Sequence, residues 1–548
     1  MTDSLSTRQK AFATVGIMLT LLLVALDQTV VGTAMPRIIA ELNGLSVYAW
    51  VTTAYLVAST VVIPVSGKLG DMFGRKPFML VGMVGFMVAS WLSGFSQSMT
   101  ELIAFRAIQG IFGGVLFSTI FTVLADIFEP AQLVRVQGLF GAVFGLSSVI
   151  GPTVGGWITD NLSWRWVFYV NIPVGALAIL TTVFFVPYVK SKASWKEIDF
   201  VGVLLLSVGV IPFLIGLSIT NTHAWTSPEV LTLLIGGGAV LVAFGAYETR
   251  IARNPVVPFE LFRRNQFAVM ALMSFFTSIG LFGGILFVPL LYQGVLSISA
   301  TNSGNLLIPM TGGLVVFSTI SGQLLPRIKY YRIIGVLGIA AMIFGMLLLT
   351  TVTASTSQWT VAAYTVILGG GLGLTFPLSI SVVQVALPQE VVGVATSQMQ
   401  FWRNLGGVVG TAVLGSILAN RLTTHIQSQV AALHLPPQFL RGVPSGGSPQ
   451  SILDPNNLAH IRAGLAPAAR PVFDQVIHAI RLGLADAIHD VFLIGAAILI
   501  VALVTSAFLK EVPIPRGRRP APGIEVQPEV RGQVPEPLRL APGANADG

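Results

Sequence analysis

Asp27 and Arg106 each interrupt a long apolar stretch of the chain. A charge in hydrocarbon is costly, so an intramembrane carboxylate takes up a proton or lines a water-filled cavity. Asp27 is the only acidic residue deep within such a stretch in the first half of the chain, which makes it the candidate proton carrier. A structural hydrogen bond between two helices is the alternative role for this side chain.

Arg106 keeps its proton in a protein, so it is not a proton carrier itself. It can hold a cavity polar or act electrostatically on a nearby carboxylate. Snorkelling of the side chain to the outer interface is its alternative role. Gln109 lies one helical turn further along the chain and can share the same hydrogen bonds. We therefore expect Asp27, Arg106 and Gln109 to form a proton-coupling group.

The remaining residue types exclude several kinds of chemistry. The chain contains no cysteine, which excludes disulfides, thiolate catalysis and cysteine-ligated metals. No histidine lies in the core of an expected span, so we expect no intramembrane histidine relay. We expect no catalytic centre, no metal site and no cofactor. The six histidines are His223, His425, His434, His460, His478 and His489.

A basic, glycine-rich segment, GKLGDMFGRK, occupies positions 67–76. Its glycines allow a tight turn and a close approach of helices. Asp71 can cap a helix N-terminus and can pair with Arg75, four residues later. An ordinary basic turn accounts for the lysines and the arginine, but not for the three glycines and the aspartate at these spacings. The candidate gating residues are Gly67, Gly70, Asp71, Gly74, Arg75 and Lys76.

Two further features lie within apolar stretches. The segment GAVFGLSSVIGPTVGG at 141–156 places small residues along helix faces, where they permit close backbone contact. Proline in this segment removes a backbone donor and is expected to kink the helix. Arg403 is a second intramembrane arginine, and it could anchor at the inner interface, contact an inner gate or meet an anionic substrate. The candidate residues of the glycine-rich segment are Gly145, Gly151, Pro152, Gly155 and Gly156.

The composition indicates the kind of element that carries these residues. Hydrophobic residues make up 53% of the 548 residues and charged residues only 10%, whereas soluble proteins carry about 25% charged residues. Many apolar runs reach the roughly 20 residues that a helix needs to cross a bilayer. A helix satisfies its own backbone hydrogen bonds in lipid. We therefore expect an all-α integral membrane protein.

We expect about fourteen transmembrane helices, and an even number places both termini on one side of the membrane. The expected spans are 11–34, 47–66, 78–96, 101–124, 136–158, 165–187, 199–220, 229–248, 267–291, 303–324, 332–352, 359–383, 395–419 and 490–509.

Basic residues are concentrated in every second connection between these spans. If the N-terminus is cytoplasmic, the short outer connections hold only Arg37 and Arg165, whereas the short inner connections hold Lys68, Arg75, Lys76, Arg135, Lys190, Lys192, Lys196, Arg250, Arg253, Arg263, Arg264, Arg327, Lys329 and Arg332. Positive charge favours cytoplasmic loops. We therefore expect a multi-pass protein of the inner cell membrane with both termini in the cytoplasm. The net charge of +8 then reflects topology rather than nucleic-acid binding.

Several segments resemble ordered motifs of the major facilitator superfamily. GKLGDMFGRK resembles its signature loop, LIAFRAIQGIFGG at 102–114 resembles its fourth-span motif, and the segment at 141–156 resembles its antiporter motif. LDQTVVGTAMP at 26–36 and WRWVF at 164–168 resemble the fourteen-span drug:proton antiporter branch, of the EmrB and QacA type. Gly32 departs from that branch, which commonly has Asn at this position.

The resemblance implies the major facilitator fold, with two six-helix bundles around a central cavity and two accessory helices. The expected units are residues 1–188 as the first bundle, 189–265 as a linker with the accessory spans, and 266–510 as the second bundle. An outer loop at 420–489 belongs to the second bundle, and helical periodicity after Pro471 predicts an amphipathic helix on the outer face or leading into the last span. Residues 511–548 are rich in Pro, Gly and charge, which predicts a disordered cytoplasmic tail.

The resemblance also implies proton-coupled efflux of small hydrophobic or amphiphilic molecules by alternating access, with Arg106 as the coupling arginine. The expected partners are the substrate, protons and the lipid bilayer, and the expected state is a monomer. Export of an endogenous lipid, siderophore or other amphiphile is the alternative within transport. A membrane enzyme would need paired acids or clustered histidines, and we find neither. A non-transporting sensor would be expected to have a soluble signalling domain.

Overall fold

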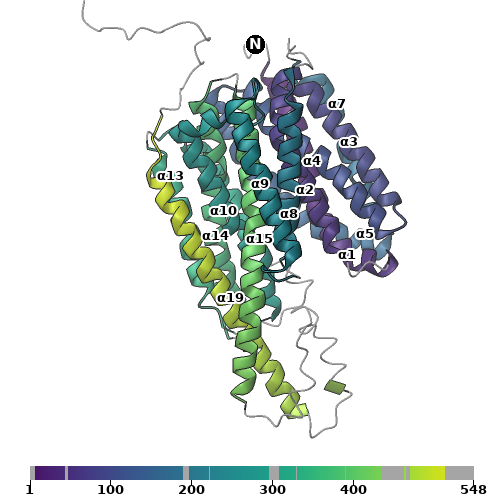
Figure 1. The fold of residues 1–548 in the computed structure, drawn as a ribbon, viewed down its shortest axis with the longest axis vertical. Coiled ribbons are helices and arrows are strands. Elements are labelled where there is room, and N and C mark those ends of the chain that lie inside the picture. The colour runs from purple at the N-terminus through teal and green to yellow at the C-terminus, as the bar shows by residue number, and fades with distance from the viewer. Residues whose placement is uncertain are drawn as a thin grey trace, which may run out of the picture.

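The computed structural model describes residues 6–42, 47–188, 197–220, 223–294, 308–328, 330–353, 355–388, 391–433, 462–463 and 470–512. Most of the expected linker at 189–196, the middle of the expected outer loop and the predicted tail from 513 onward lie outside these residues. Every regular element in the described part of the chain is helical (Figure 1).

The helices run back and forth across the molecule and are joined by short connections (Figure 1). In chain order they are α1 (Thr7–Leu42), α2 (Ala49–Phe73), α3 (Arg75–Phe95), α4 (Met99–Ile127), α5 (Pro130–Asn161), α6 (Trp166–Tyr169), α7 (Asn171–Phe185), α8 (Phe200–Ile219), α9 (Pro228–Arg250), η3 (Phe259–Arg263), α10 (Asn265–Gly294), α12 (Ile308–Leu324), α13 (Arg332–Leu349), α14 (Gln358–Ala386), α15 (Val392–Ala431) and α19 (Arg470–Ala507).

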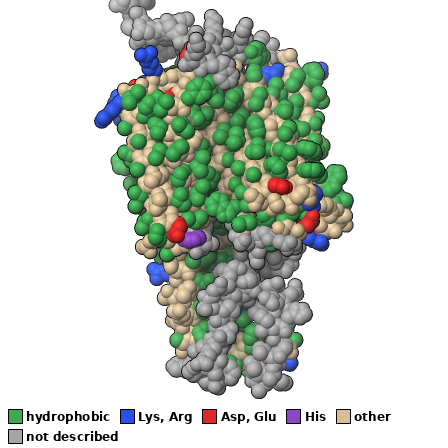
Figure 2. Space-filling model, turned by 45° about the vertical axis from the view of Figure 1, so that its right-hand side comes forward, with side chains coloured by type: hydrophobic (Ala, Val, Ile, Leu, Met, Phe, Trp, Pro, Cys, Tyr) green, Lys and Arg blue, Asp and Glu red, His purple; other side chains and the backbone are tan. Residues whose placement is uncertain are grey.

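The prediction of an all-helical membrane protein is confirmed. Thirteen helices of the described chain are long and apolar enough to cross a membrane, and α12 is a shorter apolar helix of 17 residues. Hydrophobic side chains cover the flank of the molecule, while charged side chains lie mostly toward its two ends (Figure 2). The apolar flank matches the hydrocarbon core of a bilayer, and the charged ends match its interfaces.

Two apolar cores organise the helices. The first joins side chains of α1 to α5 and α7, including Phe86, Phe121 and Phe140. The second joins side chains of α10 to α19, including Met342 and Phe492. Helices α8 and α9 pack against each other, and α8 also packs against α2 and α15. The boundaries expected for the three units at 188 and 265 stay predictions.

Helix α1 begins, and helix α19 ends, at the end of the molecule that lies at the top of Figure 1. We call it the terminal end. At the opposite end, α15 and α19 extend beyond the other helices (Figure 1). We call it the hairpin end.

The segment expected to be an outer loop at 420–489 is partly helical. Helix α15 runs on to Ala431, and α19 already begins at Arg470. The two helices stabilise each other there, because Gln429 donates to Asp486 at 3.0 Å and His425 lies 3.0 Å from Asp490. The amphipathic helix predicted after Pro471 is therefore the beginning of the last span.

Candidate functional site

A closed group of polar side chains surrounds Asp27 inside the first core. Arg106 donates from Nη1 to Asp27 Oδ2 at 2.6 Å, and both side chains are almost completely buried. Gln109 donates from Nε2 to Asp27 Oδ1 at 2.9 Å. The structure thus brings together the three residues of the predicted proton-coupling group, which come from α1 and from successive turns of α4.

Two neutral residues complete this group, and sequence reasoning missed both of them. Asn171, at the start of α7, donates to Asp27 Oδ1 at 2.8 Å. Ser90 of α3 accepts from Asn171 at 2.8 Å and from Gln109 at 3.0 Å. The only signal in the sequence was a polar residue within each of these apolar helices.

Aromatic side chains enclose the guanidinium group of Arg106. Its Cζ atom lies 4.4 Å from the centre of the Tyr55 ring and 5.9 Å from that of Phe168. A side chain at Gly110 would come within 2.4 Å of the Tyr55 carbonyl oxygen, so this glycine allows α2 to approach α4 and place the ring. The resulting environment is dry and strengthens electrostatic interactions with Asp27.

This arrangement couples protonation to structure. A proton on Asp27 would remove the negative charge that balances Arg106, and an unbalanced buried charge is strongly destabilising. Protonation of Asp27 would therefore weaken the contacts that join α1, α4 and α7 at this group. Among the described residues, no three His, Cys, Asp or Glu side chains are placed to hold a metal ion.

The candidate gating segment at 67–76 is mostly helical rather than a loop. Helix α2 continues to Phe73 and α3 begins at Arg75, so the turn consists of Gly74 alone. Gly74 has φ 98° and ψ 132°, a conformation that side chains disfavour. The expected spans 47–66 and 78–96 left residues 67–77 as a short connection, and the structure reduces it to Gly74 because both helices continue beyond their most apolar stretch.

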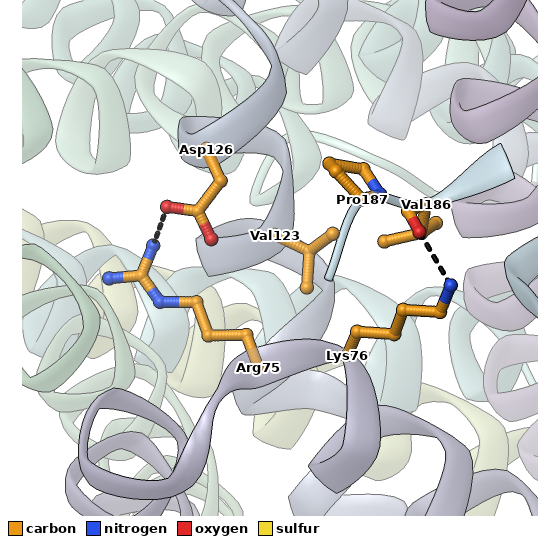
Figure 3. A pocket seen from close by; sticks show the side chains of 6 residues that line it. All are labelled: Arg75, Lys76, Val123, Asp126, Val186 and Pro187. Carbon is orange, nitrogen blue, oxygen red and sulfur yellow. Dashed lines mark hydrogen bonds and ion pairs between the residues drawn. The ribbon is translucent and has the colours of Figure 1, made fainter. Parts of the chain in front are cut away.

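Arg75 joins two acidic residues at the terminal end. Its guanidinium group bonds Asp71 at 2.8 Å. It also bonds Asp126 of α4 at 2.5 Å, as Figure 3 shows. Lys76 donates to the carbonyl oxygen of Val186 at 2.7 Å, after the end of α7 (Figure 3). The pocket between them has a volume of about 10 Å³, near the minimum for one water molecule, so it is a structural junction and too small for a substrate.

Asp71 also reaches the second bundle. Its Oδ2 accepts from the backbone N–H of Val394 at 2.9 Å, in the first turn of α15. The predicted capping role is therefore present, but at a helix far away in sequence. A side chain at Gly67 would overlap Ser397, so this glycine lets α2 approach α15, whereas a methyl group at Gly70 would make only ordinary contacts, at 4.0 Å, with Arg75 and Thr119. Lys68 donates to Asn254, which follows α9.

The glycines of α5 lie on two faces of the helix. Gly141 and Gly145 lie against α12, where added side chains would come within 2.6 Å of Ser318 and 2.3 Å of Val315. Gly151 and Gly155 lie against Thr29 and Thr33 of α1. Helix α5 thus packs closely on helices of both bundles. A methyl group added at Gly156 would meet no other described atom within 4 Å, and the kink at Pro152 stays a prediction.

A buried polar seam also joins the two bundles near the terminal end. Gln137 of α5 donates to Gln384 of α14 at 2.5 Å, and Gln384 donates to Thr396 of α15 at 3.1 Å. Ser318 of α12 donates to the carbonyl oxygen of Gly138 at 3.0 Å. With the contact of Asp71, these bonds hold the bundles together at this end, so the structure is closed there.

Arg403 of α15 contacts side chains of the second bundle. It donates to Gln400 at 2.8 Å and to Ser379 of α14 at 2.9 Å. Its Cζ atom lies 3.8 Å from the centre of the Phe376 ring. The guanidinium group turns toward α14, and the Phe376 ring that it contacts packs against Phe121 and Phe144 of the first bundle. This geometry favours a role beside the interface of the bundles over anchoring at the inner membrane interface.

The comparisons with known proteins agree with this architecture. The family model described as Major Facilitator Superfamily matches residues 17–411. The multidrug transporter protein MdtP of Bacillus subtilis (strain 168) is 37% identical over 91% of this chain and 92% of its own length. Multidrug resistance protein 3 of the same organism is 34% identical over 91% of this chain and 94% of its own.

Two solved structures share the fold at low sequence identity. The human organic anion transporter MFSD10 matches with a TM-score of 0.61 at 14% identity, over 91% of this chain and 99% of its own. The proton:xylose symporter XylE matches with a TM-score of 0.57 at 11% identity, over 91% of this chain and 95% of its own. At these identities the likeness concerns the fold alone.

Proposed function

This chain belongs to the major facilitator superfamily, and from that premise we propose that it exports small hydrophobic or amphiphilic molecules in exchange for protons. Its relatives in Bacillus subtilis are named as multidrug transporters, which supports a broad substrate range. The observation that carries the proton coupling is the buried pair of Asp27 and Arg106. Asp27 is the group that takes up and releases the proton.

Alternating access uses the contacts at the terminal end as a gate. In the closed form, Asp71 binds the first turn of α15, and Gln137 and Gln384 of the polar seam join α5 to α14. Opening breaks these bonds while the bundles rock about a central site. Protonation of Asp27 shifts the balance between the two forms because it removes the partner of Arg106.

We place the chain in the inner cell membrane as a monomer, with both termini in the cytoplasm. The distribution of Lys and Arg among the connections supports this orientation. Export of an endogenous amphiphile would use the same residues. Competition between drugs and endogenous amphiphiles in one transport assay distinguishes drug efflux from this role.

The test is efflux driven by a pH gradient in inside-out vesicles, with a panel of dyes, antibiotics and lipids that carry positive, negative or no charge. We expect Asp27→Asn to abolish this efflux with the protein still in the membrane. The wild type should release protons when a transported panel member is added in detergent, and Asp27→Asn should not. Proton release by Asp27→Asn equal to that of the wild type would place the carrier elsewhere.

A further inference from the structure

The position of Arg403 suggests a binding role. It is the twelfth residue of α15, so it lies about 16 Å along the axis from the start of that helix, deep in a membrane span. Its contacts Ser379 and Phe376 belong to α14, a helix that also contacts α5 of the first bundle. Arg403 therefore contacts, within the second bundle, a helix that itself packs against the first bundle.

An aromatic wall lies beside this guanidinium group. The ring of Phe376 is 6.4 Å from the ring of Phe121 and 6.4 Å from that of Phe144, which belong to α4 and α5. Phe376 packs against the core of the first bundle. The two bundles thus supply one apolar, aromatic surface with a positive charge at its edge.

The charge of Arg403 is not balanced by any acidic residue in the described part of the chain. Two other arginines in the helices differ, because Arg106 pairs with Asp27 and Arg75 pairs with two aspartates. Neutral oxygens of Gln400 and Ser379 take two of the five N–H groups of Arg403. Three donors and a full positive charge are left for a ligand.

We propose that Arg403 binds the anionic head of a transported molecule, and that the substrates include organic monoanions with a flat apolar body, such as aromatic carboxylates. This inference rests on the proposed transport function. A carboxylate fits the planar fork of an arginine through two parallel hydrogen bonds. The body of such a molecule lies against Phe376 and Phe144, which are partly exposed, and the ion pair is strengthened because Arg403 is partly removed from water.

The probes that test this site are 1-naphthoate and 1-naphthamide, which share shape and size but differ in charge. We measure their affinities for the purified full chain in detergent by titration calorimetry. The wild type should bind naphthoate at least tenfold more tightly than naphthamide. Arg403→Gln should weaken naphthoate binding at least tenfold and change naphthamide binding less than twofold. Arg403→Lys keeps the positive charge but loses the planar pair of donors. Its affinity for naphthoate should lie between those of the wild type and Arg403→Gln.

Arg332→Gln is the matched control, because Arg332 is an exposed arginine at the terminal end that donates to the backbone of Ala507. It should leave naphthoate affinity unchanged. Equal affinity of the wild type for both probes would overturn the proposal. An equal loss of affinity for naphthoate and for naphthamide in Arg403→Gln would overturn it as well. Binding is measured without a pH gradient, so it can be interpreted even if proton-driven efflux fails. Failure of that efflux with selective naphthoate binding would contradict the proposed function and not the role of Arg403.

Discussion

The carboxylate of Asp27 accepts hydrogen bonds at both oxygens, from Arg106 at one and from Gln109 and Asn171 at the other. A proton on this carboxylate would remove the negative charge to which these donors bond, and it would turn one of the oxygens into a donor. Four helices meet at this group, since Ser90 joins α3 to it. A single protonation event therefore acts on the packing of most of the first bundle.

We expect Asp27→Asn to lower the stability of the protein by about 3–5 kcal/mol, because it leaves Arg106 charged, buried and unbalanced. The double variant Asp27→Asn/Arg106→Gln removes both charges and should regain a large part of this loss. Thermal unfolding of the purified variants in one detergent measures the difference. Equal loss in the single and double variants would show that the ion pair does not hold these helices.

Glu41 provides a prediction for the hairpin end, outside the expected spans. The hydrogen bond from Arg165 lowers the pKa of Glu41 below its ordinary value of 4.5, although desolvation opposes this. A lowered pKa contributes stability above the unfolded pKa, and that contribution is lost as the pH falls through the folded value. The difference in Tm between the wild type and Glu41→Gln should therefore shrink as the pH falls below 4.5. A difference that stays constant from pH 7 to pH 3 would contradict this role.

Asp27, Arg106 and Gln109 could be predicted from the sequence because polar and charged residues are rare in membrane spans and usually face a protein interior. Asn171 and Ser90 could not, because neutral polar residues are tolerated on many helix faces. Their role depends on how α3 and α7 are rotated against α1, which is a property of the packed bundle. The same reason hid Asp126 as the second partner of Arg75.

At the scale of the helices, α5 is the element that contacts both bundles most closely. Its glycines lie against α1 on one face and against α12 on the other. Side chains in these positions would separate the helices, so small residues allow the backbones to slide past one another. Helix α5 can thus pass a change at Asp27, through α1, to the interface between the bundles.

We expect Gly138→Ala to open the terminal end, because its new methyl group would lie 2.9 Å from the carbonyl oxygen of Ser318. Overpacking of this kind costs about 1–3 kcal/mol, which shifts the balance by roughly five- to a hundredfold. The opening is measured as the rate at which a maleimide labels Thr396→Cys, a buried position in the polar seam. The chain has no other cysteine, so the same variant can be compared with and without Gly138→Ala. Gly156→Ala, on the same helix with open space around it, should not speed labelling. A Gly138→Ala protein that labels no faster than this control would refute the gating role of the contact.

The spans were predictable from apolar runs, but the ends of several helices were not. The predicted span 395–419 became a helix that ends at Ala431, and the predicted span 490–509 became one that begins at Arg470. Hydropathy falls where a helix leaves the bilayer, although the helix itself continues. Contacts such as that between Gly483 and Ile426 stabilise the extended pair, and they join residues that are far apart in sequence.

At the scale of the whole molecule, the two termini of the described chain lie at the same end (Figure 1). This follows from the even number of crossings, once α12 is counted with the thirteen longer helices. The side of the membrane on which that end lies depends on charge distribution rather than on packing. The charge distribution in the sequence therefore determines which side of the membrane the terminal end faces. The fold determines only that both termini lie on the same side.

We expect Thr423→Cys, exposed near the hairpin end of α15, to react with a membrane-impermeant maleimide added to intact cells. Thr249→Cys, exposed near the terminal end of α9, should react only after the cells are broken. Both variants start from a chain without cysteine, so each signal reports one position. The opposite pattern in intact cells would invert the topology.

The anionic substrate proposed for Arg403 would have an electrical consequence for transport. If each cycle exchanges one proton for one organic anion, two positive charges move inward, whereas a neutral substrate moves one and a monovalent cation moves none. Each charge gains about 2.3 kcal/mol per 100 mV of membrane potential. Voltage alone, set by a potassium gradient and valinomycin at equal pH, should therefore drive naphthoate export more strongly than naphthamide export. A transporter of this kind draws its power from the membrane potential even when the pH on the two sides is the same.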